Sequence, residues 1–260
     1  MTSLAHFWRI LVLIAFIVPA SLMLFLLPNF SSVEVYGIEM FSEAEAPFGL
    51  SYDEWVSRFW NWWISVPEGE YIPPPGGCIV NRSDGQNGSM VMLMENADPP
   101  NEIASTTNVC QISTKDGILI PLWVGWYDIA PTDDYPNKKL SDMARQEANL
   151  GDIVSNVVVD GVPVAELDVS LSLVSGEVDY EVRKFRNVSE IYTSDFDLFI
   201  PDTTHKPKQI FGDRIAGSHG WWVFLKELPA GEHTIDYRVH VTWSPQERLI
   251  HDIKYHLDVV

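Results

Sequence analysis

The sequence contains few basic residues for its length. Its 260 residues include 17 lysines and arginines against 36 aspartates and glutamates, which gives a formal net charge of −19 at pH 7. A surface of this charge repels the phosphates of nucleic acids and anionic lipid headgroups, so we exclude nucleic acid as a partner. The acidity serves either solubility in a medium rich in salt or cations, or the attraction of a cationic partner or divalent metal.

The common catalytic signatures are also missing. The sequence has no G-x-S-x-G, H-E-x-x-H, P-loop or C-x-x-C motif. The sequence therefore lacks the motifs by which serine hydrolases with a nucleophile elbow, zincins and nucleotide-dependent enzymes are usually recognised. A carboxylate-dependent hydrolase stays open, because glycoside hydrolysis needs only two suitably placed acids.

Only two cysteines are present, Cys78 and Cys110. Their separation matches no zinc or redox motif, so we predict one structural disulfide in an oxidising compartment. Asn-x-Ser sequons at Asn81, Asn87 and Asn187 predict N-glycosylation if the host glycosylates exported proteins.

An uncharged apolar run extends from Ile10 to Leu27. Its length suits a transmembrane helix or a long signal-peptide core. Cleavage after the small residues at 19–21 would leave an apolar new terminus, so we favour a retained single-pass anchor. Arg9 precedes the run and glutamates follow it, which predicts a cytoplasmic N-terminus and a C-terminal domain on the outer side of the membrane.

We divide the chain into an anchor at 1–30, a polar linker at 31–50 and an extracytoplasmic domain at 51–260. Short apolar runs with glycine, proline, asparagine and aspartate between them predict a mainly β domain. We expect a single β-sandwich, immunoglobulin-like or jelly-roll-like, with two short helices at 51–64 and 141–150. The expected strands are 89–94, 117–124, 153–159, 164–173, 178–184, 196–200, 221–225, 234–243 and 249–259.

The first predicted helix is rich in tryptophan. Ser51 and Glu54 have the spacing of a capping box at its start. Its aromatic residues fall on one broad face, and three explanations stay open: burial against the sheet, contact with the bilayer surface, or a stacking platform for sugars or bases. The candidate stacking residues are Trp55, Trp60, Trp62 and Trp63, together with Trp221 and Trp222 later in the chain.

The last two predicted strands form a hairpin whose apolar residues must share one face. A three-residue loop at 245–247 would place Asp236 opposite His256 and His240 opposite Asp252. It would also place two like charges, Arg238 and Lys254, opposite each other, which counts against this register. The two contacts between histidine and aspartate are either surface ion pairs or, should a divalent metal bind, its ligand set. We predict no other cofactor.

One further candidate site is the segment 218–222. It places the titratable His219 between two glycines and beside two tryptophans. The alternative interpretation is a tight turn that leads into an edge strand.

Several motifs, distinctive in their order, resemble a family of exported bacterial and archaeal proteins of unassigned activity. They are Tyr52-Asp53-Glu54-Trp55, Trp62-Trp63, Pro67, Cys78, Gln86 to Gly88, Cys110, Ile118 to Pro121, Val159-Asp160-Gly161, Ser194 to Pro201, Trp222 to Leu225 and Leu228 to Ile235. The resemblance spans residues 52–243 and implies secretion, a bridge between Cys78 and Cys110, and one continuous domain. It supplies no catalytic residues, and the sequence after Trp243 falls outside the family pattern.

We therefore predict a membrane-anchored, extracytoplasmic cell-envelope protein that binds an envelope protein or a polysaccharide without catalysis. A carbohydrate- or small-ligand-binding module that uses exposed tryptophans is one alternative. A carboxylate-dependent hydrolase is a second, and metal storage or sensing is a third.

Overall fold

The computed structural model describes residues 37–42, 44–67, 77–93, 103–147, 151–174, 177–202, 211–244 and 247–260. The chain separates into two units, Met1–Gly37 and Ile38–Val260. The predicted membrane anchor, Ile10 to Leu27, lies outside the described residues. None of the helices within the described ranges has the length and apolar character needed to span a bilayer.

The second unit is a β-sandwich, as the sequence predicts. Its described strands form a five-stranded sheet of order β1-β2-β4-β9-β8 and a six-stranded sheet of order β3-β11-β10-β5-β6-β7. The strands of the first are β1 (Val80–Asp84), β2 (Ser89–Leu93), β4 (Asp116–Ile129), β8 (Ser189–Ile200) and β9 (Gly212–Leu225). Those of the second are β3 (Ile103–Ile112), β5 (Gly151–Val159), β6 (Val162–Val174), β7 (Glu177–Arg186), β10 (Gly231–Ser244) and β11 (Glu247–Val259).

The main core lies between the two sheets. Strands of the six-stranded sheet alternate buried and more exposed residues, so that Ile235, Tyr237 and Val239 of β10 face the core. The Tyr237 hydroxyl donates a hydrogen bond across the core to the carbonyl oxygen of Pro121. Pro121 sits where the pairing of β4 with β9 shifts register, which is where a strand tolerates a residue without an N–H group.

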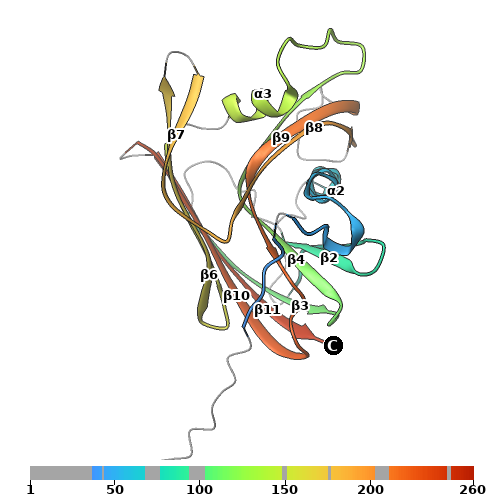
Figure 1. Ribbon diagram of the computed structural model, residues 1–260, viewed down its shortest axis with the longest axis vertical. Coiled ribbons are helices and arrows are strands. Elements are labelled where there is room, and N and C mark those ends of the chain that lie inside the picture. The colour runs from blue at the N-terminus through green and yellow to red at the C-terminus, as the bar shows by residue number, and fades with distance from the viewer. Residues whose placement is uncertain are drawn as a thin grey trace, which may run out of the picture. The chain divides into compact units, whose positions relative to one another are not determined.

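Helix α2 (Tyr52–Ser65) covers the outer face of the five-stranded sheet (Figure 1). The predicted capping box is confirmed: the Glu54 N–H donates to Ser51 Oγ at 3.2 Å, and the Ser51 N–H donates to Glu54 Oε2 at 2.7 Å. Trp55 and Phe59 are buried in a second apolar cluster beneath the helix. Their burial adds a third layer to the sandwich.

Part of the predicted linker belongs to the fold. Met40 pairs with Leu225, and the Phe41 N–H donates to the Phe224 carbonyl oxygen at 2.9 Å. Phe48, in the short 3₁₀ helix η1 (Pro47–Gly49), and Leu50 are buried under α2. These apolar side chains draw the segment onto the sheet despite its acidic composition.

Helix α3 (Leu140–Glu147) lies at one end of the sandwich, beside β9 and β4 (Figure 1). Leu140 and Ala144 are buried on its inner side. The helix can approach because Gly217 of β9 has no side chain: a Cβ there would lie 2.5 Å from the Leu140 carbonyl carbon.

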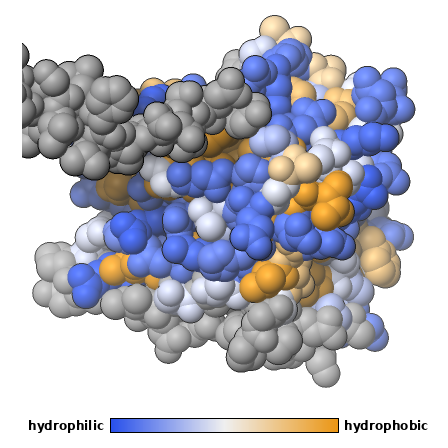
Figure 2. Space-filling view, turned by 90° about the horizontal axis from the view of Figure 1, so that it is seen from below, coloured by the Kyte–Doolittle hydropathy of each residue, from blue (hydrophilic) through white to orange (hydrophobic). Residues whose placement is uncertain are grey.

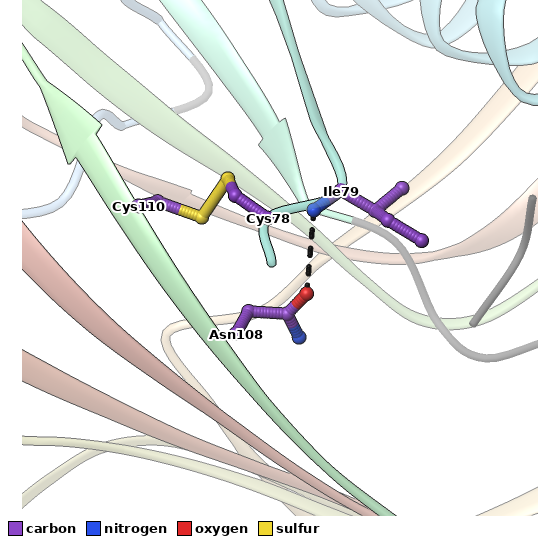
Figure 3. Close-up of a disulfide and its surroundings, with 4 residues drawn as sticks. All are labelled: Cys78, Ile79, Asn108 and Cys110. Carbon is purple, nitrogen blue, oxygen red and sulfur yellow. Dashed lines mark hydrogen bonds between the residues drawn. A yellow bond between two sulfur atoms is a disulfide. The ribbon is translucent and has the colours of Figure 1, made fainter. Parts of the chain in front are cut away.

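The predicted disulfide between Cys78 and Cys110 is confirmed (Figure 3). Cys78 precedes β1 of the five-stranded sheet, and Cys110 lies in β3, at the edge of the six-stranded sheet. The bridge therefore ties one sheet to the other. Beside it, the Ile79 N–H donates to Asn108 Oδ1 at 3.3 Å.

The predicted register of the last hairpin is wrong by two residues. Apolar residues do pair on one face, but Asp236 lies opposite Lys254 and Arg238 lies opposite Asp252. The pairing shifts between Thr242 and Ser244. The prediction assumed a three-residue loop and no such shift, and an error in either changes the partner of every residue along both strands.

Replacement of Gly217 by alanine should loosen α3. The added methyl group collides with the helix backbone, so we expect a loss of about 1 to 3 kcal/mol in the free energy of unfolding, measured by urea titration. Gly125→Ala is the matched control, because its Cβ would lie 3.8 Å from the Ala144 oxygen, an ordinary contact. Equal effects of the two substitutions would contradict the proposed close approach.

Removal of the disulfide should destabilise the domain. A Cys78→Ala/Cys110→Ala variant should lose about 3 to 4 kcal/mol of unfolding free energy, as the chain-entropy model gives for cysteines 32 positions apart. Wild-type protein treated with reductant serves as the comparison and should unfold at the same urea concentration as the variant. A variant as stable as the oxidised protein would show that the bridge is not a structural tie.

Candidate functional site

A hollow of about 360 Å³ lies beside the N-terminus of α2, next to the edge strand β8. Three acidic residues line it, Glu45, Asp53 and Glu190. Two of them have partners elsewhere, since Glu45 forms an ion pair with Lys226 at 3.0 Å and Asp53 accepts a hydrogen bond from the Thr193 hydroxyl at 3.1 Å.

Glu190 is the most extensively bonded of the three. His219 Nε2 lies 2.9 Å from its Oε1, and the Tyr192 hydroxyl donates to the same oxygen at 2.8 Å. The Tyr180 hydroxyl donates to Oε2 at 2.7 Å. Because Tyr180 belongs to β7 and Glu190 to β8, this network joins the edge strands of the two sheets.

Aromatic and cationic groups surround the network. The His219 ring lies 4.5 Å from the Tyr192 ring and 5.1 Å from the Trp221 ring, centroid to centroid. The guanidinium of Arg145, on α3, lies 4.9 Å from the centre of the Tyr180 ring. The His219 side chain is only 2% exposed, so it contacts Glu190 but cannot itself touch a ligand.

The electrostatics of the hollow favour ionised carboxylates. Burial raises the pKa of Glu190, but the hydrogen bonds from His219, Tyr180 and Tyr192 outweigh it, and the net pKa is lowered. A hydrogen bond from the Ser42 N–H and the contact with Lys226 lower the pKa of Glu45 to about 2. Burial and the bond to Glu190 raise the pKa of the Tyr192 hydroxyl, which therefore stays protonated as a donor.

The lowered pKa values of Glu45 and Glu190 argue against the hydrolase alternative at this hollow. A general acid for glycoside hydrolysis needs a carboxyl group whose pKa is raised, so that it holds a proton at neutral pH. Glu45 and Glu190 have the opposite shift and are suited to accept hydrogen bonds or attract cations. Within the described parts of the chain, no three His, Cys, Asp or Glu side chains are grouped so that they could hold a metal ion.

The predicted stacking residues lie mainly in the core. Trp55, Trp60, Trp221 and Trp222 are each 2% exposed or less, and Trp62 and Trp63 are half-buried. The Trp60 indole N–H donates to Ser218 Oγ at 2.7 Å, which ties α2 to β9. Covered rings offer no face to a ligand, and this favours the first of the three explanations for the tryptophan-rich helix.

The four predicted metal ligands do not converge. His240 Nε2 lies 3.8 Å from Asp252 Oδ1, but Asp236 pairs with Lys254 at 2.9 Å. His256 lies opposite Thr234 and not opposite Asp236. Burial of His240 lowers its pKa, so the described geometry is that of ordinary sheet ion pairs around a neutral imidazole.

Two of the three sequons lie between strands of the sandwich and one lies within a strand. Asn87 is exposed between β1 and β2, and Asn81 is half-buried in β1. Asn187 lies between β7 and β8 with a positive φ of 53°, and its amide donates to the Val164 carbonyl oxygen at 2.8 Å. Glycosylation of all three stays a prediction.

The segment 218–222 is the middle of β9 and forms no turn. It nevertheless supplies His219, the residue singled out from the sequence. The partners of His219 were missed because Tyr180, Glu190 and Tyr192 form no motif, and they meet only where the chain crosses from one sheet to the other. The alternation of Glu190 and Tyr192 with apolar Ile191 was the one available signal that they share a face.

Comparison of the chain with protein-family models, with curated proteins and with solved structures finds no match. The site is therefore interpreted from its own geometry. The resemblance to exported proteins stays a prediction.

Replacement of Glu190 by glutamine tests the network. The variant places an amide NH₂ against hydroxyl donors, and we expect it to lose about 1 to 3 kcal/mol of unfolding free energy at pH 7. The folded-state pKa of Glu190 lies below its unfolded value, so the carboxylate contributes fully above the unfolded pKa. This contribution is lost as the pH falls through the folded pKa.

Urea titrations from pH 7 downward should therefore show the gap between wild type and Glu190→Gln closing below about pH 4.5, the ordinary pKa of the group. Glu181→Gln, at an exposed position on β7, is the control and should stay close to wild type throughout. A gap that does not change with pH would mean that the carboxylate charge is not what stabilises the network.

Proposed function

We propose that the protein is a membrane-anchored component of the cell envelope whose domain lies outside the cytoplasm. In this proposal the domain binds an envelope protein or a surface polysaccharide and catalyses no reaction. The observation that carries the proposal is the disulfide between Cys78 and Cys110. Such bonds persist in oxidising compartments and are rare in the cytosol, where thiols are kept reduced.

The surface chemistry supports the same proposal. Figure 2 shows one face of the molecule, on which hydrophilic side chains predominate among the coloured residues. With a formal charge of −19, such a domain stays soluble and is repelled by anionic headgroups, so it depends on a tether to remain at a membrane. The run from Ile10 to Leu27 is the proposed tether.

The non-catalytic part of the proposal rests on the hollow beside α2. Both carboxylate oxygens of Glu190 are already hydrogen-bonded to neighbouring side chains of the protein. His219 is buried behind it. This arrangement stabilises the junction of β7 and β8 and keeps His219 from exchanging protons with a substrate in the hollow.

Topology and thiol state in intact cells test the proposal. We expect an externally added protease to degrade the domain, and we expect both cysteines to resist alkylation until a reductant is added. A cytoplasmic protein of the same cells is the control and should survive the protease. Recovery of this chain from the cytosol with both thiols free would overturn the envelope proposal.

A further inference from the structure

The outer face of the six-stranded sheet carries a groove of about 610 Å³. It crosses four neighbouring strands, β3, β11, β10 and β5. The face lies on the far side of the main core from α2, so the groove is separate from the hollow at Glu190. Hydroxyl groups of Ser105 and Thr107 and the amide of Asn156 line its two flanks.

Two ion pairs form the centre of the groove. Asp236 of β10 lies opposite Lys254 of β11, with 2.9 Å between Oδ1 and Nζ. Arg238 lies opposite Asp252 one step further along the strands, and their side chains are in direct contact. In the first pair β10 supplies the acidic group, and in the second it supplies the basic one. Acidic and basic groups therefore alternate both along each strand and across the two strands.

The charge balance of this groove differs from that of the chain. The described residues that line it include two carboxylates and two cationic groups, whereas the whole chain carries −19. Further ion pairs continue on the same face beyond the groove, for example Lys184 with Glu166 at 2.6 Å. The hollow beside α2, by contrast, has acidic residues and no basic one among the described residues that line it.

We propose that this groove binds a neutral, hydroxyl-rich polymer, a glycan chain without charged groups. The proposal rests on the proposed function and names the chemistry of its partner. A hydroxyl group both donates and accepts hydrogen bonds, and the groove presents carboxylate acceptors and cationic donors side by side. Because the ion pairs already hold these side chains in place, binding costs less conformational entropy than it would with free side chains.

The charge of the protein favours a neutral glycan over three other possible partners. An anionic polymer and a second copy of the chain are both repelled by a body of −19. A cationic protein would gain more at the acidic parts of the surface than in a balanced groove. Tyr237, the aromatic residue among the described residues that line the groove, is 1% exposed and turned into the core, so its ring is not available for stacking.

Affinity electrophoresis of the purified full chain in detergent tests the proposal. Native gels contain one neutral polymer each, a β-glucan, an α-glucan or a mannan, or the anionic polymer polygalacturonate. We expect at least one neutral polymer to retard the protein and polygalacturonate to have no effect. Tryptophan fluorescence should stay unchanged on binding, because no indole is among the described residues that line the groove.

Paired substitutions that preserve net charge locate the binding surface. Asp236→Ala/Lys254→Ala and Arg238→Ala/Asp252→Ala should each weaken retention about tenfold, the factor expected when hydrogen bonds to charged groups are lost. Glu166→Ala/Lys184→Ala removes an ion pair of the same sheet face outside the groove and should leave retention unchanged. Thermal melting of each variant confirms that it is folded.

Three results would overturn the proposal. Either no neutral polymer retards the protein, or only polygalacturonate retards it, or the groove variants are retarded as strongly as the Glu166→Ala/Lys184→Ala control. The outcome is independent of the topology experiment. An external domain that retains no glycan would remove this ligand and leave the envelope role. If instead a neutral glycan retards the protein but the chain is found in the cytosol with both thiols reduced, the glycan-binding groove would stand and the envelope role would fall.

Discussion

Burial of both faces of β9 is the constraint that arranges the rest of the domain. Trp221 and Val223 point into the core between the sheets, while Trp222 and Phe224 point the other way, under α2. A sheet with two apolar faces needs a cover on each side. The six-stranded sheet supplies one cover, and the tryptophan-rich helix supplies the other.

The same constraint explains what could be predicted from the sequence and what could not. The capping box and aromatic face of α2 are local patterns, and both predict the observed helix. The glycines at 217 and 220 suggested a turn, yet they lie inside a strand. A Cβ at Gly220 would stand 2.7 Å from the Trp123 oxygen, so close backbone approach, which only the fold reveals, is their reason.

The terminal hairpin shows a second limit of sequence patterns. Alternation fixes which residues face the core, but registers that differ by two residues satisfy it equally well. Electrostatics distinguishes them. The predicted register opposed Arg238 to Lys254, whereas the observed one pairs each with an aspartate. A like-charge contact across neighbouring strands is therefore a usable criterion when apolar patterns are degenerate.

The two polar sites differ in what holds them together, and this difference bears on their roles. Glu190 lies partly buried between the sheets, where removal of its carboxylate would leave three neighbouring side chains without this partner, so its network serves the fold first. The pairs on β10 and β11 are about half exposed, and such pairs contribute little stability. Polar groups that the fold scarcely needs, held in order by their ion pairs on an exposed sheet, are the ones free to form additional hydrogen bonds with a partner.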